Sequence, residues 1–277
     1  MGRPRKRHVQ TSIRFPDKNG QQRGRRRGEK WRGKPPGRKP KLLGRPGSPH
    51  TKRPEVARRS AFHIVLRVNR EVGSLRRRHM YRAMRAATIA VALRELNFET
   101  QGAFRIVHIS IQRTHVHLIV EADSKEALAK GLQGFQISAA KHINREYSAH
   151  AGLERRRRGN VFTDRYHREH LTSPRQARNA MAYVLNNWRK HGEDRRLGRA
   201  RNDGRDTGAA RWNVDPYSTG ALFGGWKQRV DAELLWRWPE TYQPLVVYVP
   251  QSWVLRTGWT RHGRVSFHEV PSVAHVR

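Results

Sequence analysis

Apolar and polar residues alternate with two different periods between residues 58 and 192, and little regular pattern is present on either side. Apolar residues at every second position are typical of strands, and apolar residues three or four positions apart are typical of helices. The first pattern predicts strands at 62–68, 104–111 and 114–121 and a short fourth strand between 159 and 171. The second pattern predicts helices at 75–96, 124–147 and 174–190.

This order of elements, strand, helix, strand, strand, helix, strand, helix, determines the expected fold class. It predicts an α+β fold with a ferredoxin-like, four-stranded antiparallel sheet. We expect two helices to cover one face of the sheet. We expect the last helix to lie toward the other, open face.

Two histidines lie in the strand that completes the predicted central hairpin. At the period of a strand, His115 and His117 share one face with Ile119, whereas Val116 and Leu118 point to the other face. Neutral imidazole is a common ligand of divalent metals, and two rings two residues apart on a strand can bind one ion. The alternative is a half-exposed sheet face on which both histidines bind nothing.

The last predicted helix carries a candidate nucleophile and a candidate third ligand. Tyr183 and Asn187 are four residues apart, so their side chains lie on the same side of the helix. If that side faces the histidines, Asn187 supplies an oxygen ligand, and the Tyr183 hydroxyl lies one turn away. A tyrosine in that position can attack a metal-bound phosphate. The alternative is that Tyr183 is an ordinary core aromatic.

The charge of the chain points to a polyanion as its partner. The 277 residues include 58 Lys and Arg against 22 Asp and Glu, a formal net charge of +36. Such a charge opposes compaction unless a polyanion neutralises it, and nucleic acid is the first candidate. No apolar run approaches the roughly 20 residues that span a bilayer, so we expect no membrane partner. We expect a cytoplasmic protein. The absence of cysteine excludes disulfides, thiolate metal sites and cysteine nucleophiles.

The segments outside 58–192 have loop-like compositions. Residues 1–57 contain 19 Lys and Arg against three acids, with much Gly and Pro, and are predicted to be a disordered basic leader. Residues 32–46 within it resemble hooks that insert into the minor groove of DNA, although a generic solvated tail fits equally well. We expect a basic linker at 193–214. Residues 215–277 are predicted to be an accessory segment that docks on the core or on DNA, with a strand at 245–249 and a short helix after Ser252.

Arginines of the predicted domain are candidate phosphate contacts that frame a DNA stem beside the open face. The candidates are Arg67, Arg76, Arg77, Arg78, Arg82, Arg155, Arg156, Arg157 and Arg158.

The sequence His115-Val116-His117, followed by Tyr183 to Asn187, resembles the single-tyrosine HUH transposases of insertion sequences. The branch it resembles most is the REP-associated tyrosine transposases of bacteria. The resemblance covers residues 61–191. It departs from the family at Arg113-Thr114, where Pro-Asn is usual, and at Trp188, where Pro is usual.

The resemblance implies a mechanism and a set of site residues. His115, His117 and Asn187 would hold Mg²⁺ or Mn²⁺. Tyr183 would cleave single-stranded DNA near a hairpin, retain a 5′-phosphotyrosine and release a 3′-hydroxyl. Whether the active site is completed within a monomer or across a homodimer stays open.

The predicted function is therefore that of a DNA transposase or endonuclease. The alternative is a non-catalytic, domesticated DNA- or RNA-binding protein in which the histidines are inert. Ferredoxin-like RNA-binding modules place aromatic residues on the open face of their central strands. Here that face is predicted to carry histidines.

Overall fold

The computed structural model describes residues 54–96, 102–163, 165–194, 214–228 and 242–270. All of them belong to one compact unit, Gly47–Arg277. The predictions for the minor-groove hooks, for almost all of the basic leader and for most of the basic linker lie outside the described residues.

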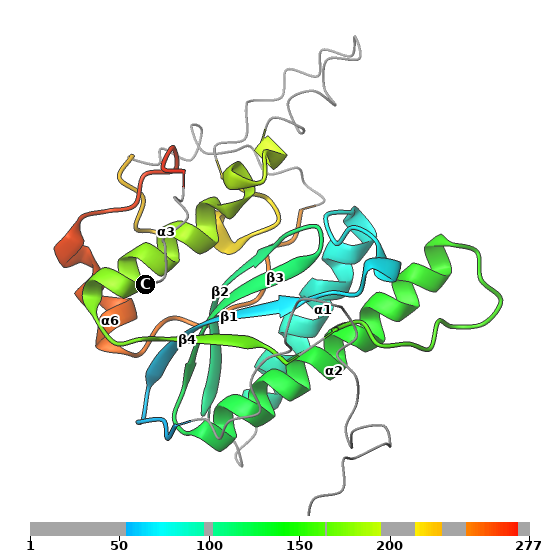
Figure 1. The fold of residues 1–277 in the computed structure, drawn as a ribbon, viewed down its shortest axis with the longest axis horizontal. Coiled ribbons are helices and arrows are strands. Elements are labelled where there is room, and N and C mark those ends of the chain that lie inside the picture. The colour runs from blue at the N-terminus through cyan, green and yellow to red at the C-terminus, as the bar shows by residue number, and fades with distance from the viewer. Residues whose placement is uncertain (1–53, 97–101, 164, 195–213, 229–241, 271–277) are drawn as a thin grey trace, which may run out of the picture. The chain divides into compact units, whose positions relative to one another are not determined.

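Four antiparallel strands form one sheet in the order β2-β3-β1-β4 (Figure 1). This is the strand order of a ferredoxin-like fold and confirms the predicted fold class. The strands are β1 (Ser60–Arg67), β2 (Phe104–Ile111), β3 (His115–Ala122) and β4 (His167–Leu171). Before β4, the predicted strand residues near Val161 contribute only an isolated bridge between Phe162 and Val68.

Helices α1 (Arg78–Glu95) and α2 (Lys125–His150) cover one face of this sheet. The side chain of Ser124 caps the start of α2 by accepting a hydrogen bond from the backbone N–H of Ala127. Gly131 allows α2 to approach β2, because a Cβ at this position would overlap the ring of Phe104. None of the described helices is both long and apolar enough to cross a membrane.

Alternate residues of the strands fill the core beneath α1 and α2. The strand residues in this core include Ile64, Leu66, Val116, Leu118 and Val120. The face assignment predicted from the alternation of β3 is therefore confirmed on this side of the sheet.

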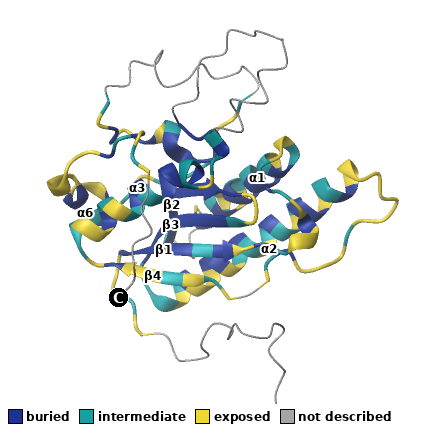
Figure 2. Cartoon of the chain, turned by 45° about the horizontal axis from the view of Figure 1, so that its top comes forward, coloured by how far each residue is buried: buried dark blue, intermediate teal, exposed yellow. Residues whose placement is uncertain are grey.

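Helix α3 (Pro174–Lys190) lies on the opposite face of the sheet (Figures 1 and 2). It begins with a capping box in which Ser173 and Gln176 satisfy each other's backbone N–H groups, and Pro174 occupies the first turn. Its apolar side packs on Ile119 of β3 within a second buried cluster. The face is thus covered along α3.

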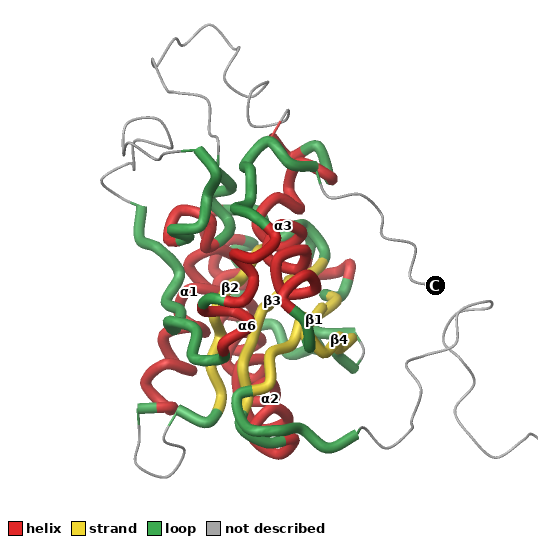
Figure 3. Tube along the Cα trace, turned by 90° about the vertical axis from the view of Figure 1, so that its left-hand side faces the viewer, coloured by secondary structure: helices red, strands yellow, loops and turns green. Residues whose placement is uncertain are grey.

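Leu245 belongs to the core beneath α1 and α2. Segments 214–228 and 251–270 add to the cover on the α3 face. They contain the short helices η2 (Thr219–Leu222), α6 (Trp253–Arg256) and η3 (Gly258–His262). Buried Trp226 and Trp259 belong to the same apolar cluster as α3. The buried carboxylate of Glu121 accepts hydrogen bonds from the backbone N–H groups of Gln251 and Ser252. Gln251 and Ser252 thus join the start of α6 to β3, and in Figure 3 α6 lies beside the strands.

The predicted strand at 245–249 is wrong, although the segment follows the free edge of β2. The backbone N–H of Tyr248 donates to the carbonyl of Ile106 at 2.8 Å, and that of Val246 donates to Oγ1 of Thr88 at 3.2 Å. Pro244 and Pro250 bracket the segment and have no N–H to extend a ladder. The short helix expected after Ser252 is present as α6.

Candidate active site

Three histidines from two adjacent strands meet on the α3 face of the sheet. In the antiparallel register of β1 and β3, Val65 lies opposite His117 and Arg67 lies opposite His115, so His63 is diagonal to His117. Nε2 of His63 lies 3.0 Å from Nδ1 of His117. The two rings stack with centroids 5.3 Å apart. The ring of His115 meets that of His117 edge-on at 4.7 Å.

Helix α3 places Tyr183 directly above this group. The ring centroid of Tyr183 lies 5.3 Å from that of His117 and 5.7 Å from that of His63, and both contacts are edge-on. Burial raises the pKa of the half-buried Tyr183 phenol. The structure thus brings together the tyrosine and the histidines that the sequence singled out.

Asn187, one turn after Tyr183, is fully buried without a hydrogen-bond partner among the described residues. Neither its Oδ1 nor its Nδ2 has a partner, and the same holds for Nε2 of His117. Buried polar atoms without partners are rare in folded proteins because each costs about 1–3 kcal/mol. Three such atoms, one on His117 and two on the helix turn after Tyr183, indicate a place for a polar ligand or an ion.

Burial keeps the two HUH histidines neutral. Burial, together with the nearby His191 and Arg67, lowers the pKa of His115 to about 4. Burial and the adjacent His63 and His115 lower the pKa of His117 well below its usual value. Neutral imidazole is the form that coordinates a metal, so both rings carry a lone pair for that purpose near pH 7.

The donors available here fit a divalent cation. Within the described ranges, no group of three or more His, Cys, Asp and Glu side chains is arranged to hold a metal ion. A site on β3 therefore requires a ligand of another type, and the buried amide of Asn187 offers an oxygen. Two imidazoles and an amide oxygen suit Mn²⁺, and also Mg²⁺ when it keeps several waters.

Three residues around this group were missed as site residues by the sequence reasoning. His63 shares the face of the HUH histidines, a position that the strand period suggested, but its contact with His117 depends on the register between strands. Oε2 of Glu169 lies 3.8 Å from Nδ1 of His63, and the interaction with His63 lowers the pKa of Glu169. Nζ of Lys190 lies 5.1 Å from the centroid of the Tyr183 ring.

Two of the arginines predicted to contact phosphate are engaged inside the protein. The side chain of Arg76 is only 4% exposed, and it donates to both carboxylate oxygens of Asp215 at 2.7 and 2.9 Å and to the carbonyl of Ile111. Arg157 donates to Oδ1 of Asn144 at 2.7 Å and to Glu71. The prediction of phosphate contacts is wrong for Arg76, because its buried guanidinium is paired with the carboxylate of Asp215. Most of the side chain of Arg157 is likewise bound within the protein.

The other candidate arginines lie on the surface, and most of them gather at one end of the sheet. Arg67, Arg77, Arg78, Arg82, Arg155, Arg156 and Arg158 are exposed. The segment before α1 is joined to the hairpin turn by a hydrogen bond from the N–H of Leu75 to the carbonyl of Arg113. The loop after α2 is joined to the same end by the ion pair between Arg157 and Glu71. β3 begins with His115 at this end, so most of the exposed arginines lie at the same end of the sheet as His115.

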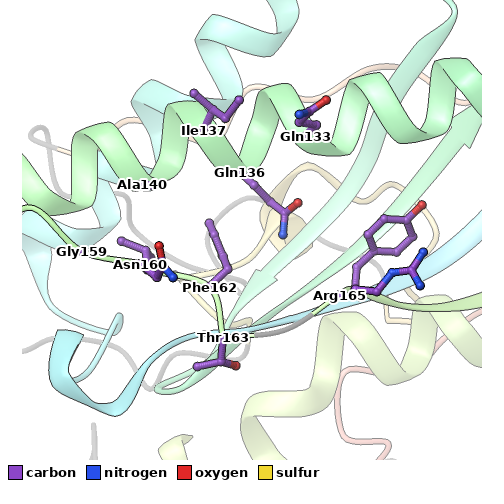
Figure 4. Close-up of a pocket in the computed structure, with 11 residues that line it drawn as sticks. Gln133, Gln136, Ile137, Ala140, Gly159, Asn160, Phe162, Thr163 and Arg165 are labelled. Carbon is purple, nitrogen blue, oxygen red and sulfur yellow. The ribbon is translucent and has the colours of Figure 1, made fainter. Parts of the chain in front are cut away.

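A separate open groove of about 550 Å³ lies between α2 and residues 159–163, 165 and 166 (Figure 4). Its lining is mainly apolar, with Gln133 and Gln136 on α2 and Asn160 and Arg165 on the facing segment as polar members. Because α2 covers the other face of the sheet, this groove is distinct from the group around Tyr183.

Comparisons with known proteins place part of the chain near one family. The family model described as "Transposase IS200 like" matches residues 57–187, which include both HUH histidines, Tyr183 and Asn187. A solved structure of a REP-associated tyrosine transposase bound to a REP hairpin is 19% identical, covers 52% of this chain and 75% of that chain, and gives a TM-score of 0.35. No curated protein sequence matches the chain. Over residues 57–187, the chain is therefore similar to the IS200-like transposases.

Proposed function

We propose that this protein cleaves and rejoins single-stranded DNA next to hairpins, with Tyr183 as the nucleophile and a divalent metal held by His115, His117 and Asn187. The observation that carries the proposal is the position of Tyr183. Its ring lies 5.3 Å from that of His117, and the buried Nε2 of that histidine and the buried amide of Asn187 lack partners among the described residues. A core tyrosine would not require this surrounding set of metal donors.

The proposed cleavage is a transfer of one phosphoryl group to the tyrosine. The Oη atom of Tyr183 attacks the scissile phosphorus, a new P–O bond forms, and the bond to the 3′ oxygen breaks. The phenol loses a proton and the released 3′ oxygen gains one, so the step is balanced. Attack of a 3′-hydroxyl on the phosphotyrosine reverses these changes and rejoins the strand.

The metal would act at the phosphate rather than at the tyrosine. Mg²⁺ or Mn²⁺ bound here would polarise a phosphoryl oxygen and neutralise the charge that develops on it. The protein supplies neutral imidazoles, since burial lowers the pKa of His115 and of His117. The ammonium group of Lys190 over the Tyr183 ring favours the negative charge that the phenol oxygen acquires.

Single-stranded DNA beside a hairpin suits the charge around the site. Arg67 is exposed at the end of β1, directly opposite His115. Arg77 and Arg155 are exposed at the same end of the domain. Fixed cations at defined spacing can grip a duplex stem while the cleavable strand reaches Tyr183.

A covalent trapping experiment tests the proposal. Full-length protein is incubated with a labelled hairpin oligonucleotide that carries a single-stranded flank, with Mg²⁺ or Mn²⁺, and is separated under denaturing conditions. We expect a labelled adduct for wild type, none for Tyr183→Phe, and none without metal. Tyr147→Phe is the matched control, because this tyrosine belongs to α2 and packs against the core on the other face of the sheet. An adduct that persists in Tyr183→Phe would remove Tyr183 from the mechanism.

A further inference from the structure

A row of polar side chains crosses three neighbouring strands on the α3 face. Glu169 of β4 lies directly opposite His63 of β1 in the register of that pair. His63 in turn lies diagonal to His117 of β3. Nδ1 of His63 is 3.8 Å from Oε2 of Glu169, and its Nε2 is 3.0 Å from Nδ1 of His117. Each ring nitrogen of His63 therefore has its own polar neighbour.

The contact between His63 and His117 needs one hydrogen, and two tautomers can supply it. Either Nδ1 of His117 donates to Nε2 of His63, or the direction is reversed. The carboxylate of Glu169 attracts a hydrogen to Nδ1 of His63. In a neutral ring this leaves Nε2 of His63 as the acceptor, so His117 donates from Nδ1 and keeps a lone pair on Nε2.

The surroundings of Nε2 of His117 favour the same tautomer. This atom is buried and has no hydrogen-bond partner in the part of the chain that the structure describes. A hydrogen on it would be a buried donor with no acceptor, whereas a lone pair can be used by a cation. Because Nδ1 of His117 is occupied by His63, Nε2 is the nitrogen left to bind a metal.

We infer that His63 is a positioning residue that, supported by Glu169, fixes His117 in the tautomer that presents its Nε2 lone pair to a divalent metal. The inference rests on the proposed function. A second partner that fixes the tautomer and orientation of a metal-binding histidine raises metal affinity. His63 would act through His117 and would not itself touch the metal or the DNA.

Two replacements of His63 separate this role from simple packing. His63 also stacks on His117 and contacts the edge of Tyr183, so its loss could disturb the site by shape alone. His63→Phe keeps an aromatic ring but has no acceptor. His63→Gln loses the ring but has an amide oxygen at the approximate position of Nε2. A packing role predicts that Phe is the better replacement, and a tautomer role predicts Gln.

The first readout is the tautomer of His117 in the metal-free protein. ¹⁵N-histidine labelling of the full chain and two-bond hydrogen–nitrogen correlation spectra at a pH of about 8 distinguish the two neutral forms. His117→Ala assigns the signals. We expect His117 to carry its hydrogen on Nδ1 in wild type and in His63→Gln, and to move toward the Nε2–H form in His63→Phe.

The second readout is the affinity for Mn²⁺ alone, measured by electron paramagnetic resonance without DNA. We expect His63→Phe to bind Mn²⁺ about 10- to 100-fold more weakly than wild type, and His63→Gln to recover most of that loss. Glu169→Ala should weaken binding about two- to fivefold, because this carboxylate is half exposed. His170→Phe is the control, since His170 stacks on Phe62 on the other face.

Two results overturn the inference. One is an Nε2–H tautomer of His117 in the metal-free wild type. The other is a His63→Phe variant that binds Mn²⁺ as tightly as wild type. Failure of the proposed metal site looks different, since a His115→Ala/His117→Ala double variant would then bind Mn²⁺ like wild type.

Discussion

The buried ion pair between Arg76 and Asp215 gives a direct test of which arginines serve the fold and which serve DNA. The side chains are 4% and 0% exposed, and the guanidinium meets the carboxylate through two nitrogens at 2.7 and 2.9 Å. Burial opposes the charge of Arg76, but Asp215 and Glu193 outweigh it and raise the pKa of Arg76. Arg76 therefore keeps its positive charge in the folded protein, and its contacts with Asp215 join the start of α1 to the segment after residue 213.

Arg76→Met should strongly destabilise the protein. The substitution keeps most of the aliphatic volume but leaves the buried carboxylate of Asp215 without its cation. Breaking one side of a buried ion pair costs about 3–5 kcal/mol. With a urea dependence of about 2–3 kcal/mol per M, the midpoint of unfolding should fall by roughly 1–2.5 M. Arg77→Met is the matched control, because Arg77 is exposed and its loss should change stability by less than about 0.5 kcal/mol.

A double variant shows whether the loss comes from the unpaired charge. Arg76→Met with Asp215→Leu removes both charges, and such replacements are often neutral. We expect recovery of most, but not all, of the stability, because the backbone N–H of Tyr217 also loses Asp215 as its acceptor. Urea unfolding followed by circular dichroism gives the stabilities and the coupling between the two positions.

DNA binding over a salt series completes this test. Folded Arg76→Met should keep the wild-type salt dependence, whereas Arg77→Met should lower the slope by about 0.9 if Arg77 contacts a duplex phosphate. The reasoning is refuted if Arg76→Met unfolds within about 1 kcal/mol of wild type while its salt slope falls by one phosphate contact. Arg76 would then be a DNA ligand, as its sequence context first suggested.

Three further predictions concern the site and its surroundings. Asn187→Ala should reduce metal-dependent formation of the covalent adduct by about 10- to 100-fold, and Asn187→Asp, which keeps an oxygen ligand, should retain more activity when both are assayed in Mn²⁺. The pKa of His115 is lowered to about 4 in the folded protein, against a pKa near 6.5 in the unfolded chain. The stability that the neutral ring contributes is therefore present above pH 6.5 and is lost as the pH falls toward 4. His115→Gln should flatten the pH dependence of thermal unfolding between these two pH values. Arg155→Ala with Arg158→Ala should lower the salt slope of hairpin binding by about 1.8 and leave stability within about 0.5 kcal/mol, and an unchanged slope would place the stem elsewhere.

Local pattern was sufficient to predict the elements of the fold. The alternation in 104–111 predicted the bounds of β2, and the capping signal at Ser173-Pro174 predicted the start of α3. The alternation in 114–121 placed His115 and His117 on one face of the sheet. These features depend on residues close together in the sequence, so a single chain carries enough information to define them.

Contacts between distant segments could not be predicted in the same way. Nothing in the sequence near Arg76 reveals that Asp215, far along the chain, neutralises it. The contact of His63 with His117 requires the register of β1 against β3, which local alternation leaves open. The apolar run at 245–249 has the composition of a strand. Its backbone instead donates to Thr88 and Ile106, and the run itself gives no sign of these partners.

The graded burial of the site indicates how a phosphate would reach the tyrosine. His117 is 3% exposed and Asn187 is 0% exposed, so the inner part of the site is closed by the sheet and α3. His115 is only partly buried, and Arg67, opposite it in the register, is exposed. The surface arginines that gather at this end of the sheet would attract a DNA backbone to the same side. We therefore expect the scissile strand to approach from the end of the sheet that carries His115, where this partly buried histidine is accessible. His117 and Asn187 lie in the buried interior, where the low dielectric strengthens each charge interaction that the phosphate makes.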